Sequence, residues 1–310
     1  MLGFSTAIAL PFALFAAFPG WLNSLPKSGG WLNTVKVSLG FLELALAFKF
    51  LSNADLVLQL HWLEREVFIA IWIAVFGTFA LYLFGKIKLP HDSTLENISV
   101  TRFSLGLIVL TFTIYLIPGL WGAPLKLISG FPPPMQYSES PYGIGYTKLG
   151  SGEIIQEKLP DGAKHGPHDI VTFLDYQKGM TYAKEVNKPV LLDFTGHACV
   201  NCRKMEERVW SDPTILSILK NDIVLVSLYV DDKRLLPDNE KYISETTGKK
   251  IKSIGNKWSD FQIKKYKANA QPFYVLLNHL GENLNAHSAY DPDVDSYLKW
   301  LQEGVANFKK

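Results

Sequence analysis

Long apolar runs separated by short polar loops make up the first 120 residues of the chain. Four runs are long and apolar enough to cross a bilayer, which takes about 20 residues per helix; they are residues 2–22, 35–51, 67–84 and 103–120. No Lys or Arg precedes the first run, so we interpret it as a true span and not as a signal peptide. The pattern predicts an N-terminal all-α transmembrane domain of four helices over residues 1–121.

The charges of the loops between these runs predict their orientation, because loops rich in Lys and Arg face the cytoplasm. Basic residues follow the first and third runs, whereas the loop between the second and third runs is mostly acidic. The basic residues are Lys27, Lys36, Lys86, Lys88 and Arg102, and the acidic loop has Asp55, Glu64 and Glu66 against Arg65. We therefore expect a multi-pass protein of the bacterial inner membrane. Its C-terminal part would lie in the periplasm, where disulfide chemistry occurs.

Prolines in the first run and an ionisable residue in the second leave alternatives open. Pro11 and Pro19 interrupt the first run, which predicts either a tolerated kink or a moving or re-entrant helix. Glu43 lies well inside the second run, where an ionisable group is costly. It either serves a proton path, or pairs with a polar neighbour, or lies nearer the membrane surface than the pattern indicates.

Residues 122–167 differ from both flanking parts. They are rich in Gly, Pro, Ser and Tyr, and they show little helical or strand periodicity. Such a composition indicates an extended periplasmic linker on which a soluble domain swings between partners. His165 lies in this stretch and His168 directly after it, and histidines in a polar loop favour solvated side chains over a metal site.

Residues 168–310 have the pattern of a soluble α/β domain. Apolar spacing predicts a helix over 170–187 that ends before Pro189. A buried strand follows at 190–194, then a turn and a second helix over 199–209. The remaining predicted elements are a strand at 223–230, a charged insertion at 231–256, a helix at 258–266, a strand at 273–277, a short strand after a turn near Gly281, and a terminal helix at 293–308.

Cysteine and charge counts narrow the function. The 310 residues contain only two cysteines, Cys199 and Cys202. This excludes a disulfide scaffold, and it disfavours structural zinc because His197 is too close in sequence to complete a four-ligand site alone. A net charge of +2, without a dense basic stretch carrying aromatics, excludes nucleic-acid binding. We expect no metal, and no cofactor beyond a redox-active Cys199–Cys202 disulfide.

The place of the two cysteines in the predicted elements indicates thiol–disulfide exchange. Cys199 begins a helix directly after a strand and a turn, and a helix N-terminus lowers the pKa of a thiol through its partial positive charge and free N–H groups. Cys199 is therefore the expected attacking thiol. Cys202, about one turn later, is expected to resolve the mixed disulfide. A C-x-x-C motif between a strand and a helix predicts a thioredoxin-like fold.

Two acidic residues and a proline complete the candidate site. Asp193 lies in the preceding strand and Glu206 lies four residues after Cys202, so both could approach the sulfurs from the core side and shuttle protons. The competing interpretations are a capped strand end for Asp193 and a solvated helix face for Glu206. An Asp within an apolar run is costly without a role, which favours function at Asp193. Pro272 opens a strand, which fits a cis peptide bond against an active site.

These residues resemble the DsbD family of thiol:disulfide interchange transporters. The C-terminal resemblance lies in DFTGHACVNCRKME at residues 193–206, in VWSDP at residues 209–213, and in Gln271-Pro272. The membrane part resembles the later transmembrane helices of that family through FPGWL at residues 18–22, LPKSG at residues 25–29, Trp31, Val35-Lys36 and Gly40-Phe41. The resemblance covers nearly the whole chain.

The resemblance implies a relay of electrons. In this family electrons pass from cytoplasmic thioredoxin through a membrane cysteine pair to the C-terminal domain, and then to an N-terminal periplasmic domain that reduces client proteins. It implies that Cys199 and Cys202 are the attacking and resolving cysteines, that Asp193 and Glu206 are the carboxylates beside them, and that Pro272 is the cis-proline. The implied partners are a cysteine-bearing membrane donor, periplasmic thiol–disulfide proteins, including those of cytochrome c maturation, and the lipid bilayer.

Two departures from the family limit this expectation. Ala198, after His197, stands where thioredoxin-like domains commonly have Trp. The membrane half has no cysteine, shows four runs where the family has eight spans, and follows no N-terminal periplasmic domain. We therefore interpret the chain as the C-terminal part of such a transporter, from a truncated gene or a split protein, with its donor dithiol on other residues. Competing functions are a membrane-anchored oxidase or isomerase with a higher reduction potential, and a non-catalytic assembly module.

Overall fold

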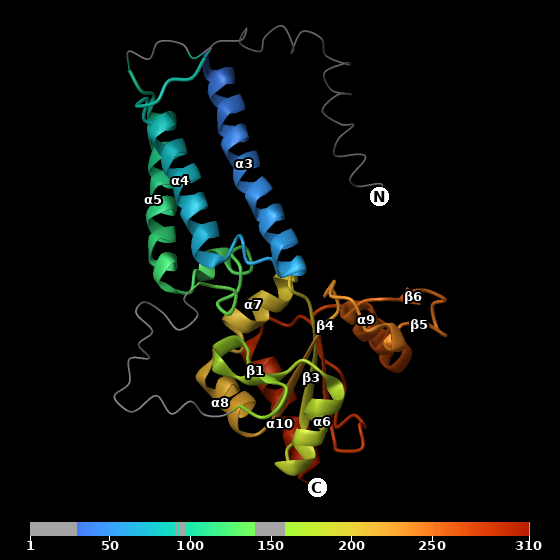
Figure 1. Cartoon of the computed structure of the whole chain (residues 1–310). Coiled ribbons are helices and arrows are strands. Elements are labelled where there is room, and N and C mark those ends of the chain that lie inside the picture. The colour runs from blue at the N-terminus through green and yellow to red at the C-terminus, as the bar shows by residue number, and fades with distance from the viewer. Residues whose placement is uncertain (1–29, 91, 93–96, 140–158, 310) are drawn as a thin grey trace, which may run out of the picture. The chain divides into compact units, whose positions relative to one another are not determined.

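A computed structural model describes residues 30–90, 92, 97–139 and 159–309 (Figure 1). The chain divides into two compact units: unit 1 is drawn from residues 1–45 and 75–112, and unit 2 from residues 46–74 and 113–310. The first apolar run, with Pro11 and Pro19, lies outside the described residues. Residues 140–158 of the predicted linker also lie outside them.

Three long helices match the second, third and fourth apolar runs. They are α3 (Gly30–Leu58), α4 (Arg65–Leu83) and α5 (Val100–Leu116), the last followed by the 3-10 helix η1 (Ile117–Trp121). Within the described ranges, two stretches are long and apolar enough to cross a membrane, Arg65–Leu83 and Val100–Trp121. The side chain of Glu43, in the middle of α3, is exposed. The helical N-terminal half is confirmed, whereas four membrane spans stay a prediction.

Within unit 1, Arg102 of α5 closes the C-terminal end of α4. Its guanidinium donates from Nε to the carbonyl of Leu83 at 2.9 Å and from Nη2 to that of Tyr82 at 2.8 Å. The last carbonyls of a helix have no partner inside the helix, and a cation there also interacts favourably with the helix dipole. Arg102, one of the basic loop charges, therefore also holds the two helices together at this end.

The C-terminal part of unit 2 contains a five-stranded sheet with the strand order β1-β2-β4-β3-β7. The strands are β1 (Ala163–His165), β2 (Val171–Phe173), β3 (Val190–Thr195), β4 (Val224–Tyr229) and β7 (Phe273–Leu277). The three middle strands run parallel, and the edge strands β1 and β7 run antiparallel to their neighbours. Every residue of β3 is buried, which fits a central strand covered on both faces.

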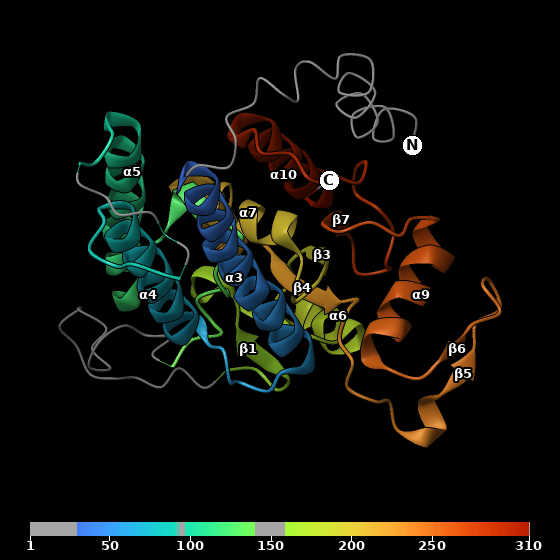
Figure 2. The same ribbon diagram turned by 90° about the horizontal axis from the view of Figure 1, so that it is seen from above.

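Helices cover both faces of this sheet. Leu191 of β3 joins a core cluster with residues of α7 (Val200–Arg208), α8 (Pro213–Asn221) and α10 (Val294–Phe308). Val190, Leu192 and Phe194 point the other way and pack with α6 (Tyr176–Glu185) and α9 (Ile254–Tyr266). Figure 2 shows β3 and β4 between α7 and α6. Because side chains alternate along a strand, Asp193 shares the face of Leu191, under α7.

The structure differs from the predicted elements in three places. Residues 170–187 are not one helix, because β2 comes first and Asp175 then caps α6 by accepting hydrogen bonds from the N–H groups of Gln177 and Lys178. Helix α8 was not predicted, although Asp212 caps it and Pro213 opens it. The short strand predicted after Gly281 is reduced to isolated bridges to β7.

Regular structure also lies inside the predicted linker and the predicted insertion. In the linker, Lys126–Ile128 forms a 3-10 turn and β1 already belongs to the sheet. His168 is exposed, as predicted for a loop histidine, and its Nε2 also contacts the backbone carbonyl of Glu206 at 2.7 Å. In the insertion, β5 (Tyr242–Ile243) and β6 (Lys250–Ile251) form a hairpin, and α9 begins four residues before the predicted start. The boundaries 1–121, 122–167 and 168–310 stay predictions.

Candidate active site

The two cysteines lie where β3 ends and α7 begins. Cys199 is the N-cap of α7, and its Sγ accepts a hydrogen bond from the backbone N–H of Cys202 at 3.1 Å. The two residues form a disulfide with their Cα atoms 5.3 Å apart. Cys202 is only 1% exposed, whereas Cys199 is half-buried. The predicted placement between strand and helix is confirmed, and Cys199 is the more exposed of the two cysteines.

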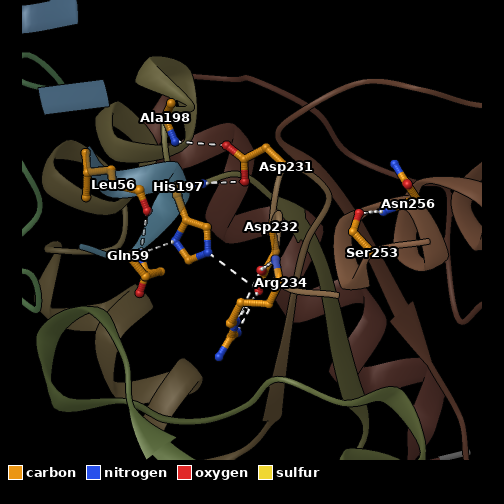
Figure 3. A network of polar contacts seen from close by, with 9 residues as sticks. All are labelled: Leu56, Gln59, His197, Ala198, Asp231, Asp232, Arg234, Ser253 and Asn256. Carbon is orange, nitrogen blue, oxygen red and sulfur yellow. Dashed lines mark hydrogen bonds and ion pairs between the residues drawn. The ribbon is translucent and has the colours of Figure 1, made fainter. Parts of the chain in front are cut away.

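Asp231 holds the backbone of the loop before the dithiol, as Figure 3 shows. Its carboxylate accepts hydrogen bonds from the N–H groups of His197 at 2.8 Å and Ala198 at 3.0 Å. Gly196 stands directly against this carboxylate, where an added Cβ would lie 2.9 Å from Asp231 Oδ2. A side chain at position 196 would therefore displace the carboxylate that positions the loop.

His197, in the loop before Cys199, contacts residues of β4, of the segment after β4, and of the loop after α3. Its ring stacks on Tyr229 with the centroids 4.1 Å apart, and its Nε2 lies 3.9 Å from Asp232 Oδ2. Its Nδ1 lies 3.4 Å from the amide nitrogen of Gln59, which also belongs to unit 2 (Figure 3). Burial alone would raise the pKa of Asp232, but contacts with His197 and hydrogen bonds from Arg234 hold it well below its usual range.

Asp193 is buried beneath α7, with only 2% of its surface exposed. Its Oδ2 accepts a hydrogen bond from Ser227 Oγ at 2.9 Å, and its Oδ1 has no hydrogen-bond partner among the described residues. Burial raises the pKa of Asp193 to about 7, against the lowering effects of Ser227 and Arg203. The strand-end interpretation is wrong, since the side chain points into the core.

Glu206 is also buried, contrary to the interpretation as a solvated helix face. Its Oε1 lies 2.8 Å from Arg203 Nη2. Burial raises the pKa of Glu206 to about 8, which Arg203 opposes and the charge of Asp193 reinforces. Burial thus brings the pKa values of both candidate carboxyls toward neutral pH, the range in which general acids and bases are most effective.

Pro272 is at the same end of the sheet as the dithiol loop. The Gln271–Pro272 peptide bond is cis. Antiparallel pairing places Phe273 opposite Phe194, so Pro272 stands beside the end of β3 where the loop to Cys199 starts. The structure thus gathers Cys199, Cys202 and Pro272 at one end of the sheet, with the two carboxyls on the core side of α7.

Sequence reasoning missed the polar residues that surround these carboxyls. They are Thr195, Arg203, Ser227 and Tyr229. Asp231, which holds the dithiol loop, was missed as well. Arg203 could have been noticed in the sequence, because it directly follows Cys202 of the C-x-x-C motif. Among the described residues no three His, Cys, Asp or Glu side chains gather as a metal site requires.

Tyr229 and Asp232 also line a pocket of about 370 Å³. Its remaining walls come from β1, α6, the insertion after β4, and α9. The insertion contributes Leu235, whose side chain is exposed, and Arg234, which pairs with Asp232 at 2.6 Å. The insertion that the sequence marks by its charge therefore builds a surface beside the dithiol loop.

The sheet order, the flanking helices and the dithiol at the start of α7 define a thioredoxin-like domain. The sequence model of a family described as thioredoxin-like matches residues 169–279. A solved structure of "DsbH Oxidoreductase" aligns with a TM-score of 0.30 and 19% identity, covering 50% of this chain and 95% of that chain.

The relatives extend the likeness into the N-terminal half. Thiol:disulfide interchange protein DsbD of Vibrio vulnificus is 25% identical over 218 residues, which are 70% of this chain and 30% of that protein. Thiol:disulfide interchange protein DsbD 1 of Pseudomonas aeruginosa is 27% identical over 210 residues, 66% of this chain and 29% of that protein. The chain is a DsbD-like protein with a C-terminal thioredoxin-like domain. It spans less than a third of the length of these relatives.

Proposed function

We propose that this chain is a membrane-anchored thiol–disulfide reductase that relays electrons from a membrane cysteine pair to periplasmic thiol proteins. The observation that carries the proposal is the Cys199–Cys202 disulfide at the N-terminus of α7, with the half-buried Cys199 outermost and Cys202 beneath it. The likeness to DsbD proteins supports thiol–disulfide oxidoreductase activity as the class of reaction.

The proposed reaction has two exchange steps. The thiolate of reduced Cys199 attacks one sulfur of a partner disulfide, and the other partner sulfur leaves as a thiolate. Cys202 then loses its proton to a nearby carboxylate and attacks Cys199 Sγ, which releases the second partner thiolate and forms the internal disulfide. Two electrons have passed to the partner. A donor dithiol returns them by the reverse exchange, and it lies on other residues because both cysteines of this chain take part.

The neighbouring residues have proposed roles in these steps. Asp193 and Glu206 take and return the proton of Cys202, which is supported by their burial and by pKa values near neutral. Pro272 lies beside the dithiol loop and lines the surface on which the partner's chain is held. No cofactor beyond the dithiol enters the reaction as we propose it.

We further propose that four helices anchor the domain, with its dithiol on the periplasmic side of a bacterial inner membrane. The apolar stretches in α4 and α5 support the anchor. The acidic loop between α3 and α4 is the side that its charges assign to the periplasm. Within unit 2, Gln59 at the start of this loop lies 3.4 Å from His197, which supports a common side for the loop and the dithiol. Proteins of cytochrome c maturation are among the proposed clients.

Trapping with Cys202→Ser tests the relay. Without the resolving thiol, mixed disulfides on Cys199 should accumulate in cells as adducts that a reductant dissolves. The matched control carries Cys199→Ser as well, and it should form none. Adducts of equal abundance in the double variant, or none with Cys202→Ser, would contradict the proposal.

The reduction potential of the dithiol separates a reductase from an oxidase. A reductase should equilibrate near thioredoxin, at about −270 mV, whereas a value near about −120 mV is typical of a strong oxidant. The measurement uses the full chain in detergent, equilibrated with thiol buffers of known potential. A value at the oxidising end would replace the reductase by the oxidase or isomerase alternative.

A further inference from the structure

A column of polar side chains runs through the sheet face that α7 covers. Asp193 and Thr195 of β3 pair in register with Ser227 and Tyr229 of β4. Leu191 and Leu225, the preceding pair on this face, belong to the apolar core. Polar groups in such a place are costly unless partners compensate them.

Arg203 is the charged partner of this column. It follows Cys202 in the first turn of α7 and is 4% exposed. Its Nη2 lies 2.8 Å from Glu206 Oε1 and donates to Thr195 Oγ1 at 3.2 Å. A buried cation thus joins α7, which carries the dithiol, to β3, which carries Asp193.

The geometry also distinguishes the two carboxyls. Arg203 engages Glu206 directly, whereas Asp193 is held only through Oδ2 by Ser227 among the described residues, with Oδ1 uncommitted. An uncommitted oxygen is the one that can accept a proton. The charge of Arg203 also lowers the pKa of Asp193, against its burial.

We infer that Arg203 is a positioning residue for the exchange reaction. It holds Glu206 and Thr195 beneath the dithiol, and its charge keeps the Asp193 carboxylate available to take the proton of Cys202. In that step the Cys202 thiol gives its proton to Asp193 and its sulfur attacks Cys199 Sγ. The bond from Cys199 to the partner breaks, and the partner sulfur leaves as a thiolate with the electron pair. The inference rests on the proposed function.

The aromatic disulfide DTNB resolves the two exchange steps. Cys199 of the reduced full chain in detergent releases one coloured thiolate on attack, and Cys202 releases a second on resolution. Because the chain has only two cysteines, each phase reports one of them. The rate of the second phase, followed from pH 6 to 10, gives the pH midpoint of the resolving step.

Arg203→Met removes the charge but keeps the bulk of the side chain. Removing an opposite charge a few ångströms away shifts a carboxyl pKa by about one to three units. The midpoint of the second phase should therefore rise by at least about one pH unit, and its rate at pH 7 should fall about tenfold. Arg203→Lys should recover part of the shift. The control, Arg208→Met, changes an exposed arginine of the same helix and should leave the midpoint unchanged.

A structural role alone would lower the melting temperature without moving the midpoint. An Arg203→Met profile identical to that of Arg208→Met would therefore overturn the inference.

If Arg203→Met does not fold, the double variant Arg203→Met/Glu206→Gln is compared with Glu206→Gln. Removing both partners of a buried pair is better tolerated than removing one. The double variant should have the higher midpoint by about one pH unit, and equal midpoints would overturn the inference. A wild-type chain that releases no second thiolate would instead refute the proposed function.

Discussion

Asp193→Asn should change how the stability of the thioredoxin-like domain depends on pH. The stability of the variant minus that of the wild type should increase as the pH rises from acidic to neutral. The pKa of the buried Asp193 carboxyl is raised to about 7 from an ordinary 3.8. In the unfolded chain this carboxyl ionises near pH 4, whereas in the folded chain it keeps its proton until about pH 7. The wild type therefore has its full stability below pH 4 and loses stability as the pH rises to 7.

The size of this loss follows from the two pKa values. The interval from 3.8 to about 7 corresponds to about 4 kcal/mol, since each pKa unit is worth about 1.4 kcal/mol. Asn does not titrate, so the difference in opening free energy between Asp193→Asn and the wild type isolates this carboxyl. Between pH 5 and 8 the difference should change by about 3 kcal/mol in favour of the variant.

Hydrogen exchange of β3 peptides, measured by mass spectrometry on the full oxidised chain in detergent, gives this opening free energy at each pH. The control, Asp295→Asn, removes an exposed carboxyl from the first turn of α10 and should give a flat profile over the same range. A constant difference between Asp193→Asn and the wild type from pH 5 to 8 would show that Asp193 is ionised throughout. The account of its raised pKa would then be wrong.

Two further predictions concern the support of the site. Asp231→Ala should increase hydrogen exchange of the two loop amides that its carboxylate binds, by the equivalent of about 1 to 3 kcal/mol. Exchange in Asp231→Asn should lie between that of the wild type and that of Asp231→Ala. Unchanged exchange in Asp231→Ala would refute the role of Asp231 in holding the loop. Tyr297→Phe should lower the melting temperature, because the buried Trp210 indole N–H donates to the Tyr297 hydroxyl at 3.1 Å and would lose its partner, at about 1 to 3 kcal/mol. Trp210→Phe should cost more because it also leaves a cavity, and a neutral Tyr297→Phe would contradict this account.

The dithiol loop could be predicted because its local signals agree with one another. A continuous apolar strand, a turn and the start of a helix follow in sequence, so Cys199 falls at the N-cap. The order β2-α6 could not be predicted in the same way. A three-residue strand, Val171–Phe173, does not interrupt apolar spacing of helical type, and the cap residue Asp175 is the signal that separates the two elements.

The polar surroundings of the dithiol depend on pairings that local sequence does not contain. Ser227 reaches Asp193 because β4 pairs with β3 in a register that only the folded sheet defines. Arg203 follows Cys202 in the sequence, but its burial depends on which face of α7 lies on the sheet. The burial of Glu206 depends on the same packing, which is why the residue could be named from the sequence and its environment could not.

The roles of Cys199 and Cys202 can be separated by following the exchange reaction of each cysteine in the absence of the other. The reduced full chain is mixed with a model peptide disulfide, and the products are identified by intact mass. Cys202→Ser should accumulate a one-to-one mixed disulfide on Cys199. The wild type should pass on to the internal disulfide and release the reduced peptide. Cys199→Ser should react far more slowly because Cys202 is buried. If Cys199→Ser formed the adduct as fast as Cys202→Ser, or if the wild type retained it, the assignment of Cys199 as the attacking thiol and Cys202 as the resolving thiol would be contradicted.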